Sequence, residues 1–275
     1  SEMPYEWTDQ LVRHAKKHNI MFLSTPFDKD AVDVLDKAGA LAYKVASYEL
    51  TDDILLRYIA RKMKPVIIST GMAYLEEVAH AVRVIQEEGN NEIIVLHCTS
   101  IYPPKNFADL NLRAMVTLGE ALKLPVGYSD HSKPPYVAVP VAAVALGACV
   151  IEKHFTDSRT GGSHDDPNSM TQEDFKRMVE EIRFAEQALS GTGVKQPVSK
   201  GAHEPGTDEI ADRWARRSLY AAQDIKEGAV LTEEMIITLR PWGGIAPKDA
   251  GLVVGKKVQR AIKARAPITW DDLLK

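Results

Sequence analysis

The sequence predicts an α/β protein built on a parallel sheet and followed by a small β-rich domain. From Leu11 to about Leu189, helical periodicity alternates with brief apolar runs, the pattern of parallel strands joined by helical crossovers. The runs show little alternation of apolar and polar residues, as expected for strands covered on both faces. They recur at intervals of roughly 20 to 30 residues, the length of a βα repeat.

We interpret six runs as strands. They are Met21–Ser24, Ala42–Ala46, Val66–Ser69, Ile93–His97, Val126–Tyr128 and Cys149–Lys153. The intervening helices begin at predicted capping residues, namely Thr8, Thr51 and Thr171, and Asp174 completes a capping box with Thr171. Because a closed parallel barrel needs eight strands, six strands predict either an open sheet or a chain that lacks the beginning of a barrel.

The second part of the chain is predicted to be a separate domain. Residues 191–207 are rich in Gly, Pro and Lys and lack periodicity, so we expect a linker there, between a first domain at 1–190 and a second at 208–275. Within the second domain, the segment 225–234 echoes the segment 262–271. The echo predicts a compact module with internal pseudo-twofold symmetry; the alternative is a coincidence between two strand-turn-helix starts.

Composition excludes several classes of function. The 34 basic and 38 acidic residues are interspersed and give a net charge of −4, so we expect no nucleic-acid partner. The longest apolar run, 137–151, contains Pro140 and is shorter than a bilayer requires, so it predicts a buried helix followed by a strand. Cys98 and Cys149 lie in apolar runs and no signal peptide precedes them, which predicts reduced core thiols in a cytoplasmic protein.

Ligands of parallel α/β folds collect where the strands end, and here those ends are rich in hydroxyl groups. Such a ring with a lysine suits an oxygen-rich anion, a carboxylate or a phosphate. Lys44 lies in a run that should be buried, where an ammonium is costly unless it meets an anion. Lys44 could therefore hold an anionic ligand, or it could reach the rim of the sheet or pair with Glu49.

Two histidines end consecutive strands, His131 and His154, and from such positions both imidazoles could share a divalent metal. The alternative is two separate hydrogen-bonded core histidines. Asp130, Glu152 and Asp165 lie close enough in sequence to orient the imidazoles. His97 ends an earlier strand, and we interpret it as a packing or supporting residue. The chain has no phosphate-binding or dinucleotide-binding glycine motif, so a nucleotide cofactor has no support.

Six motifs, in this order and at this spacing, resemble the N-acetylneuraminate (sialic acid) synthase family. They are STPFD (24–28), AYKVASYE (42–49), ISTGM (68–72), LHCTSIYPP (96–104), VGYSDHS (126–132) and IEKHFT (151–156). The small domain resembles that family's C-terminal SAF (antifreeze-like) domain through Arg217-Ser218-Leu219, 224–228 and Leu239-Arg240-Pro241. The two ends of the chain resemble the branch connected with spore coat polysaccharide synthesis.

The resemblance implies a (β/α)8 TIM barrel, lacking its first two strands in this chain, plus the SAF domain. It implies a transferase that condenses phosphoenolpyruvate with an open-chain N-acetylmannosamine-type aldehyde, releasing phosphate and forming a nine-carbon 2-keto sugar acid. His131 and His154 would bind a divalent metal, manganese or magnesium, that polarises the aldehyde. Phosphoenolpyruvate and sugar would be held by Thr25, Lys44, Ser47, Ser69, Ser100 and Ser129.

The resemblance also assigns three residues to the sugar. Glu49 and Asp165 would contact it or assist proton transfer, and Arg240 would reach into the barrel of a neighbouring subunit, which implies a domain-exchanged homodimer. The family's first two strands, which bear a glutamate and a lysine, have no counterpart before Ser1. Two alternatives follow: a truncated, non-catalytic module that binds metal and phosphoenolpyruvate, and a related synthase that acts on a phosphorylated sugar. The SAF-like region around Arg217 and Arg240 argues against the second alternative.

Overall fold

A computed structural model describes residues 3–163, 165–191 and 214–274. The chain divides into two compact units, Ser1–Thr192 and Gly193–Lys275. All of the predicted linker except Gly191, and the first residues of the predicted second domain up to Arg213, lie outside the described residues.

The first unit contains a five-stranded sheet in which every pair is parallel and the spatial order follows the sequence. The strands are β1 (Tyr43–Val45), β2 (Val66–Ser69), β3 (Ile93–Cys98), β4 (Val126–Asp130) and β5 (Ile151–Lys153). Because the strands are parallel, their carboxyl ends meet at one edge, where most of the predicted site residues of the first unit lie. Five of the six predicted strands are thereby confirmed.

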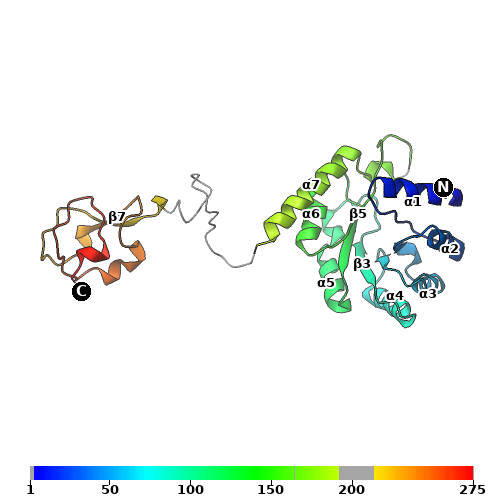
Figure 1. Cartoon of the computed structure of the whole chain (residues 1–275), viewed down its shortest axis with the longest axis horizontal. Helices are drawn as coiled ribbons and strands as arrows, with labels where there is room; N and C mark the ends of the chain where they lie inside the picture. The colour runs from blue at the N-terminus through cyan, green and yellow to red at the C-terminus, as the bar shows by residue number, and fades with distance from the viewer. Residues whose placement is uncertain (1–2, 164, 192–213, 275) are drawn as a thin grey trace. The chain divides into compact units, whose positions relative to one another are not determined.

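Helices lie around the outside of the strands (Figure 1). They are α1 (Thr8–Lys17), α2 (Lys29–Lys37), α3 (Asp53–Ala60), α4 (Leu75–Glu87), α5 (Arg113–Leu122), α6 (Ala138–Ala145) and α7 (Gln172–Leu189). Short 3-10 helices cover Tyr5–Trp7, Ser47–Glu49, Phe107–Leu110 and Asp166–Asn168. The largest buried cluster packs β1, β2 and β3 against α2, α3 and α4, which explains why these strands read as continuous apolar runs.

Contact between side chains of the two outer strands shows that the sheet curls strongly. Lys44 on β1 lies 3.3 Å from Glu152 on β5, although three strands separate β1 from β5. In a flat sheet, four strand spacings would place them about 19 Å apart. The described strands therefore form half of a barrel, with their inward side chains facing a common centre.

The predicted strand Met21–Ser24 is wrong. One long backbone hydrogen bond, from the Lys44 amide to the Ser24 carbonyl at 3.4 Å, joins this segment to β1. Its side chains Met21 and Leu23 are exposed, so packing does not hold it in a ladder. On the other side of the sheet, Phe155 and Met170 form a short parallel bridge that the sequence did not reveal.

Two of the three predicted helix starts are also wrong in detail. Thr171 caps α7 in the predicted capping box with Asp174. In α3, however, the cap is Asp52, whose carboxylate accepts a hydrogen bond from the Leu55 amide at 3.0 Å; Thr51 lies one residue too early. Thr8 is the first residue inside α1, since a 3-10 turn precedes that helix.

The prediction for the apolar run 137–151 is partly correct. The segment forms α6 and then β5, with Pro140 in the first helical turn, where a missing amide proton is tolerated. Burial is less complete than expected, and Cys149 is exposed because the strand begins only at Ile151. Cys98 is buried, and both cysteines are free thiols. In the described part of the chain, no helix combines the length and the apolar character needed to span a bilayer.

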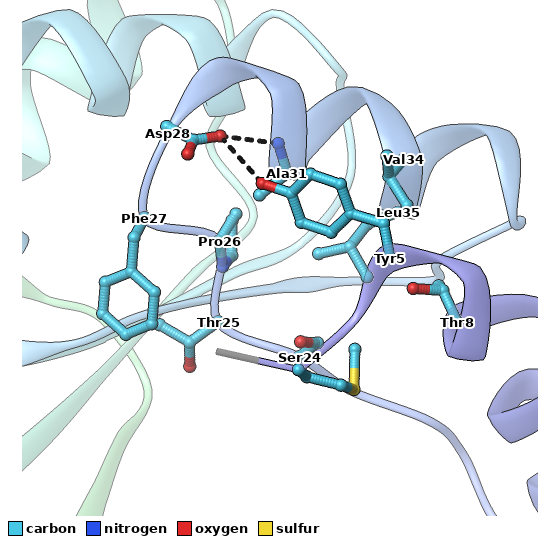
Figure 2. Close-up of a pocket in the computed structure, with 11 residues that line it drawn as sticks. Tyr5, Thr8, Ser24, Thr25, Pro26, Phe27, Asp28, Ala31, Val34 and Leu35 are labelled. Atoms are coloured by element: carbon cyan, nitrogen blue, oxygen red, sulfur yellow. Dashed lines mark hydrogen bonds between the residues drawn. The ribbon is translucent and has the colours of Figure 1, made fainter. Parts of the chain in front are cut away.

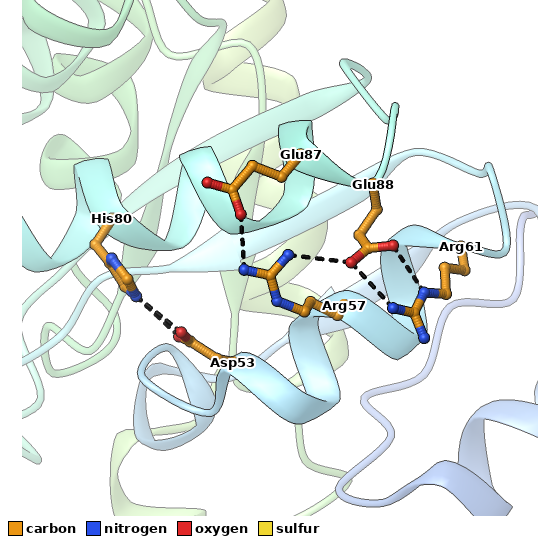
Figure 3. Close-up of polar contacts among 6 residues, drawn as sticks. All are labelled: Asp53, Arg57, Arg61, His80, Glu87 and Glu88. Carbon is orange, nitrogen blue, oxygen red and sulfur yellow. Dashed lines mark hydrogen bonds and ion pairs between the residues drawn. The ribbon is translucent and has the colours of Figure 1, made fainter.

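An ion-pair network joins α3 to α4 on the solvent side (Figure 3). Arg57 contacts Glu87 at 2.7 Å and Glu88 at 3.1 Å, and Arg61 also contacts Glu88 at 2.7 Å. Pairs this exposed to solvent add little to the free energy of unfolding, so the buried apolar faces of the two helices hold them in place.

The second unit has the internal symmetry that the sequence echo predicts. Its strands β6 (Ser218–Ala221) and β7 (Ile236–Leu239) pair antiparallel, and its 3-10 helices cover Glu233–Met235, Pro247–Leu252 and Trp270–Asp272. The equivalent residues Ile225 and Ile262 exchange backbone hydrogen bonds of 2.8 Å in both directions. Thr232 and Thr269 each precede a 3-10 helix and have nearly identical backbone angles: φ −110° and ψ 165° at Thr232, and φ −112° and ψ 166° at Thr269.

This symmetry supplies a matched test of backbone strain. Gly228 and Arg265 occupy equivalent positions with positive φ, 78° and 62°, and no atom lies within 4 Å of a Cβ added to Gly228. We expect Gly228→Ala to lower the free energy of unfolding by about 1–2 kcal/mol, through the left-handed conformation alone. Arg265→Ala is the control, because a residue with a Cβ already adopts that conformation there. Urea unfolding followed by tryptophan fluorescence measures both; equal effects would contradict the argument.

Candidate active site

Four predicted residues from four strands meet inside the half-barrel. The Lys44 ammonium donates to the Ser69 hydroxyl at 2.7 Å and forms its ion pair with Glu152. The Ser129 hydroxyl donates to the other Glu152 oxygen at 3.0 Å. The Lys44 side chain is only 8% exposed, whereas that of Glu152 is 39% exposed. The anion beside Lys44 is therefore Glu152, and the alternative pairing with Glu49 is wrong.

Two further hydroxyl groups, those of Ser47 and Ser100, meet beside this network at Gly71. The Gly71 amide donates to the Ser47 hydroxyl at 3.0 Å. A Cβ on Gly71 would overlap the Ser100 hydroxyl and would approach that of Ser47 to 2.8 Å. Glycine is therefore required here for close packing, and it brings Ser47 and Ser100 together as the motifs implied.

The two predicted metal ligands lie against each other. The rings of His131 and His154 are 5.1 Å apart between centroids, at an angle of 75°. Nδ1 of His131 donates to the Thr99 carbonyl at 2.9 Å, because a carbonyl can only accept, and this leaves the lone pair on Nε2. Nδ1 of His154 lies 3.6 Å from an Asp165 oxygen. The hydrogen bond through Nδ1 thus leaves Nε2 of His131 for a ligand.

Burial sets the charge of these imidazoles. Desolvation lowers the pKa of His131, and desolvation together with the nearby His131 lowers the pKa of His154. Both rings are consequently neutral at neutral pH, the form that binds a metal. Among the described residues, no cluster of three or more His, Cys, Asp or Glu side chains is arranged for a metal ion, so the pair would supply two ligands and leave the others to water or substrate.

The groups that orient the histidines differ from those predicted. Asp165 faces His154 as expected, but Glu152 contacts Lys44 and Ser129, and Asp130 forms a buried ion pair with Lys153. The carbonyl of Thr99 takes the orienting role for His131, and a backbone group leaves no trace in a sequence pattern. His97 hydrogen-bonds to the Leu110 carbonyl at 2.8 Å and packs beside Tyr128, in agreement with its predicted packing role.

Tyr102 is a site residue that the sequence reasoning missed. Its ring lies 4.1 Å from that of His131 and 5.7 Å from that of His154, between centroids. Burial raises the pKa of its hydroxyl to about 12, so the ring is a neutral wall beside the histidine pair. The signal was available, because Tyr102 lies in the motif that contains Ser100.

Glu49 lies in the 3-10 helix that follows β1. Burial raises the pKa of its carboxyl group, and one carboxyl oxygen is buried without a hydrogen-bond partner in the described part of the chain. A carboxyl group in this state can take up or release a proton more readily near neutral pH than an exposed one.

The remaining two predicted residues lie elsewhere. Thr25 lines a cavity of about 390 Å³ between the N-terminal segment and α2, together with Tyr5 and Asp28 (Figure 2). Asp28 caps α2 there by accepting from the Ala31 amide at 2.7 Å. Arg240 belongs to the second unit, where it directly follows β7 with its side chain exposed.

The buried histidines predict how stability depends on pH. The pKa values of His97, His131 and His154 are all lowered by burial, so the unfolded chain binds more protons than the folded chain below pH 6.5. The free energy of unfolding should therefore fall as the pH decreases through and below 6.5. Urea unfolding in the presence of a chelator measures this, and His131→Gln should reduce the slope. A flat profile would show that these imidazoles have the same pKa in the folded and the unfolded chain, in contradiction to the argument.

Known proteins resemble both units. A model of the NeuB family matches residues 1–195 and a model of the SAF domain matches residues 216–274. The chain is 39% identical over 263 residues to the pseudaminic acid synthase of Campylobacter jejuni, covering 96% of this chain and 73% of that protein. It is 38% identical over 264 residues to the N,N'-diacetyllegionaminic acid synthase of Legionella pneumophila, covering 94% and 71%.

A solved structure extends the likeness to the fold. The crystal structure of the spore coat polysaccharide biosynthesis protein SpsE from Bacillus subtilis matches with a TM-score of 0.66 and 34% identity, covering 100% of this chain and 79% of that one. The resemblance inferred from the six motifs is confirmed. The chain belongs to the NeuB family and carries a SAF domain in its C-terminal part.

Proposed function

We propose that this chain condenses phosphoenolpyruvate with an open-chain acylamino-hexose of the N-acetylmannosamine type, with uptake of one water, giving a nine-carbon 2-keto sugar acid and phosphate. One observation supports the proposal: a buried lysine with hydroxyl groups around it and a histidine pair share one face of the sheet. Ser129 and His131 are two residues apart on β4 and its extension, as are Glu152 and His154 on β5. Side chains two apart on a strand face the same side, so both sites open into the half-barrel.

Lys44 and the surrounding hydroxyls would hold phosphoenolpyruvate. The buried ammonium attracts a carboxylate or phosphate strongly, since little water screens it. Ser69 already hydrogen-bonds to that ammonium, and Ser47, Ser100 and Ser129 offer further donors around it. Glu152 is much more exposed than Lys44 and can turn aside when a second anion arrives.

His131 and His154 would hold a divalent metal, manganese or magnesium. The residues fit such an ion, because Nδ1 of His131 donates to the Thr99 carbonyl, Nδ1 of His154 lies 3.6 Å from Asp165, and both imidazoles have lowered pKa values. When bound, the ion would act as a Lewis acid that polarises the sugar aldehyde toward attack by C3 of phosphoenolpyruvate. Thr99 and Asp165 keep the two rings oriented. Glu49, with its raised pKa, is suited to move a proton on the sugar.

Release of phosphate tests the proposal. The chain is mixed with phosphoenolpyruvate, N-acetylmannosamine and Mn²⁺, and then with each component omitted in turn. We expect phosphate release only in the complete mixture. Release with arabinose 5-phosphate in place of every acylamino sugar would contradict the proposed acceptor class. Because phosphoenolpyruvate is a cytoplasmic metabolite, the proposal includes a cytoplasmic location.

Arg240 extends the proposal to a domain-exchanged homodimer. An exposed arginine at the end of β7 is available to contact the acyl group of a sugar bound in a partner subunit. We expect Arg240→Ala and His131→Ala chains, each inactive alone, to regain activity when they are unfolded and refolded together. Random pairing gives about half mixed dimers with one intact site each, or about a quarter of wild-type activity. No recovery would show that Arg240 serves its own barrel or none.

A further inference from the structure

We propose that the buried ion pair between Asp130 and Lys153 is a clamp that sets the spacing of His131 and His154. These are positioning residues, which act through the histidines and touch no substrate. The inference rests on the proposed metal-binding function of the histidine pair. It adds to that function a named pair of residues that determines how well the metal is held.

The clamp lies directly beside both histidines. Asp130 and Lys153 are register partners in the β4–β5 ladder, and each precedes one histidine by a single residue. They are the last partners of that ladder, so the strands reach the histidines just after the regular pairing ends. The Lys153 ammonium lies 2.9 Å from an Asp130 oxygen, and both side chains are fully buried.

Lys153 also holds the backbone on both sides of His131. Its ammonium donates to the Asp130 carbonyl at 3.2 Å and to the Ser132 carbonyl at 2.5 Å. The Asp130 carboxylate in turn accepts from the amide and the hydroxyl of Ser132, both at 2.9 Å. Lys153, which precedes one histidine, therefore holds the backbone carbonyls of the two residues on either side of the other.

The clamp lies on the opposite face of the strands from the histidines, so it can affect a ligand only through them. Side chains alternate between the faces of a strand, so Asp130 and Lys153 point away from the face shared by His131 and His154. Burying two charges gains little stability over a well-packed apolar pair, which leaves geometry as their specific contribution. Two ligands from adjacent strands bind one ion well only if their separation is held within a fraction of an ångström, about 0.5 Å.

The test measures Mn²⁺ affinity, with the metal alone as the probe. The double variant Asp130→Asn, Lys153→Met removes both charges and leaves neither buried alone. Its matched control is Asp36→Asn, Lys64→Met, the same substitutions at an ion pair of 2.7 Å that joins α2 to the segment before β2. Titration calorimetry on the full chain gives the dissociation constant, and circular dichroism verifies folding at the same temperature.

We expect the double variant to bind Mn²⁺ about 10- to 100-fold more weakly, the usual loss when a group that orients a metal ligand is removed, and the control to bind as the wild type does. If the double variant does not fold, Ser132→Ala decides, with an expected loss of roughly 2- to 10-fold from one missing hydrogen bond. Wild-type affinity in whichever of these variants folds would overturn the clamp. Failure of the wild type itself to bind Mn²⁺ would instead refute the proposed metal site.

Discussion

Replacing His131 with alanine should lower the rate of phosphate release about 100- to 10,000-fold, the largest effect we expect from one substitution. The imidazole is nearly fully buried and neutral, and its Nδ1 already donates to the Thr99 carbonyl. The lone pair on Nε2 is therefore the group that would bind the metal. Removing it takes away one of the two protein ligands proposed for the metal. The Mn²⁺ dissociation constant should rise together with the loss of rate.

A second buried histidine supplies the control for His131→Ala. His97 is the penultimate residue of β3 on the same sheet, is half-buried and also hydrogen-bonds to a carbonyl, so His97→Ala removes a comparable volume and hydrogen bond. Each variant leaves a carbonyl without its partner and should lose about 1–3 kcal/mol of stability. Only His131→Ala should lose metal affinity. Equal Mn²⁺ affinity in wild type and His131→Ala would remove His131 from the mechanism.

The contrast between these histidines shows what the sequence could reveal about the site. Strand ends are recognisable from apolar runs, and the carboxyl ends of parallel strands share one edge, so His131 and His154 could be brought together without coordinates. The groups that orient these histidines could not be identified from the sequence. Thr99 acts through its backbone carbonyl, and Asp130 points to the other face of the strand, where it meets Lys153.

Long-range pairing explains the remaining differences. The partner of Lys44 depends on how far the sheet curls, because β1 and β5 are distant both in sequence and in strand order. The sequence offered the nearby Glu49 as one alternative partner, whereas the curled sheet brings Glu152 to Lys44. The segment Met21–Ser24 shows the same limit, since its apolar residues suggest a strand, but what joins it to β1 is a single long backbone hydrogen bond from the Lys44 amide to the Ser24 carbonyl.

The anion site makes the second large prediction. Lys44→Met should reduce kcat/KM for phosphoenolpyruvate about 100-fold, which corresponds to about 2.8 kcal/mol and is within the range measured when one partner of a buried charged contact is removed. Most of the change should be in KM, because an anion bound equally before and during the reaction loses binding rather than rate. Lys62→Met, at the ion pair with Asp33 on the outer helices, is the control and should leave KM unchanged.

A second substitution, at Glu152, distinguishes two causes of weaker phosphoenolpyruvate binding in Lys44→Met: the lost attraction of the lysine and the new repulsion by the Glu152 carboxylate. In Lys44→Met, the carboxylate of Glu152 loses its counter-charge and is left facing the place where the anionic substrate should bind. Adding Glu152→Gln removes that charge while keeping an oxygen that can accept from Ser129. The double variant should therefore recover part of the affinity, about 5- to 10-fold, although it still lacks the lysine. If the second substitution instead weakens phosphoenolpyruvate binding further, Glu152 contacts the substrate directly and Lys44 serves to hold Glu152 in place.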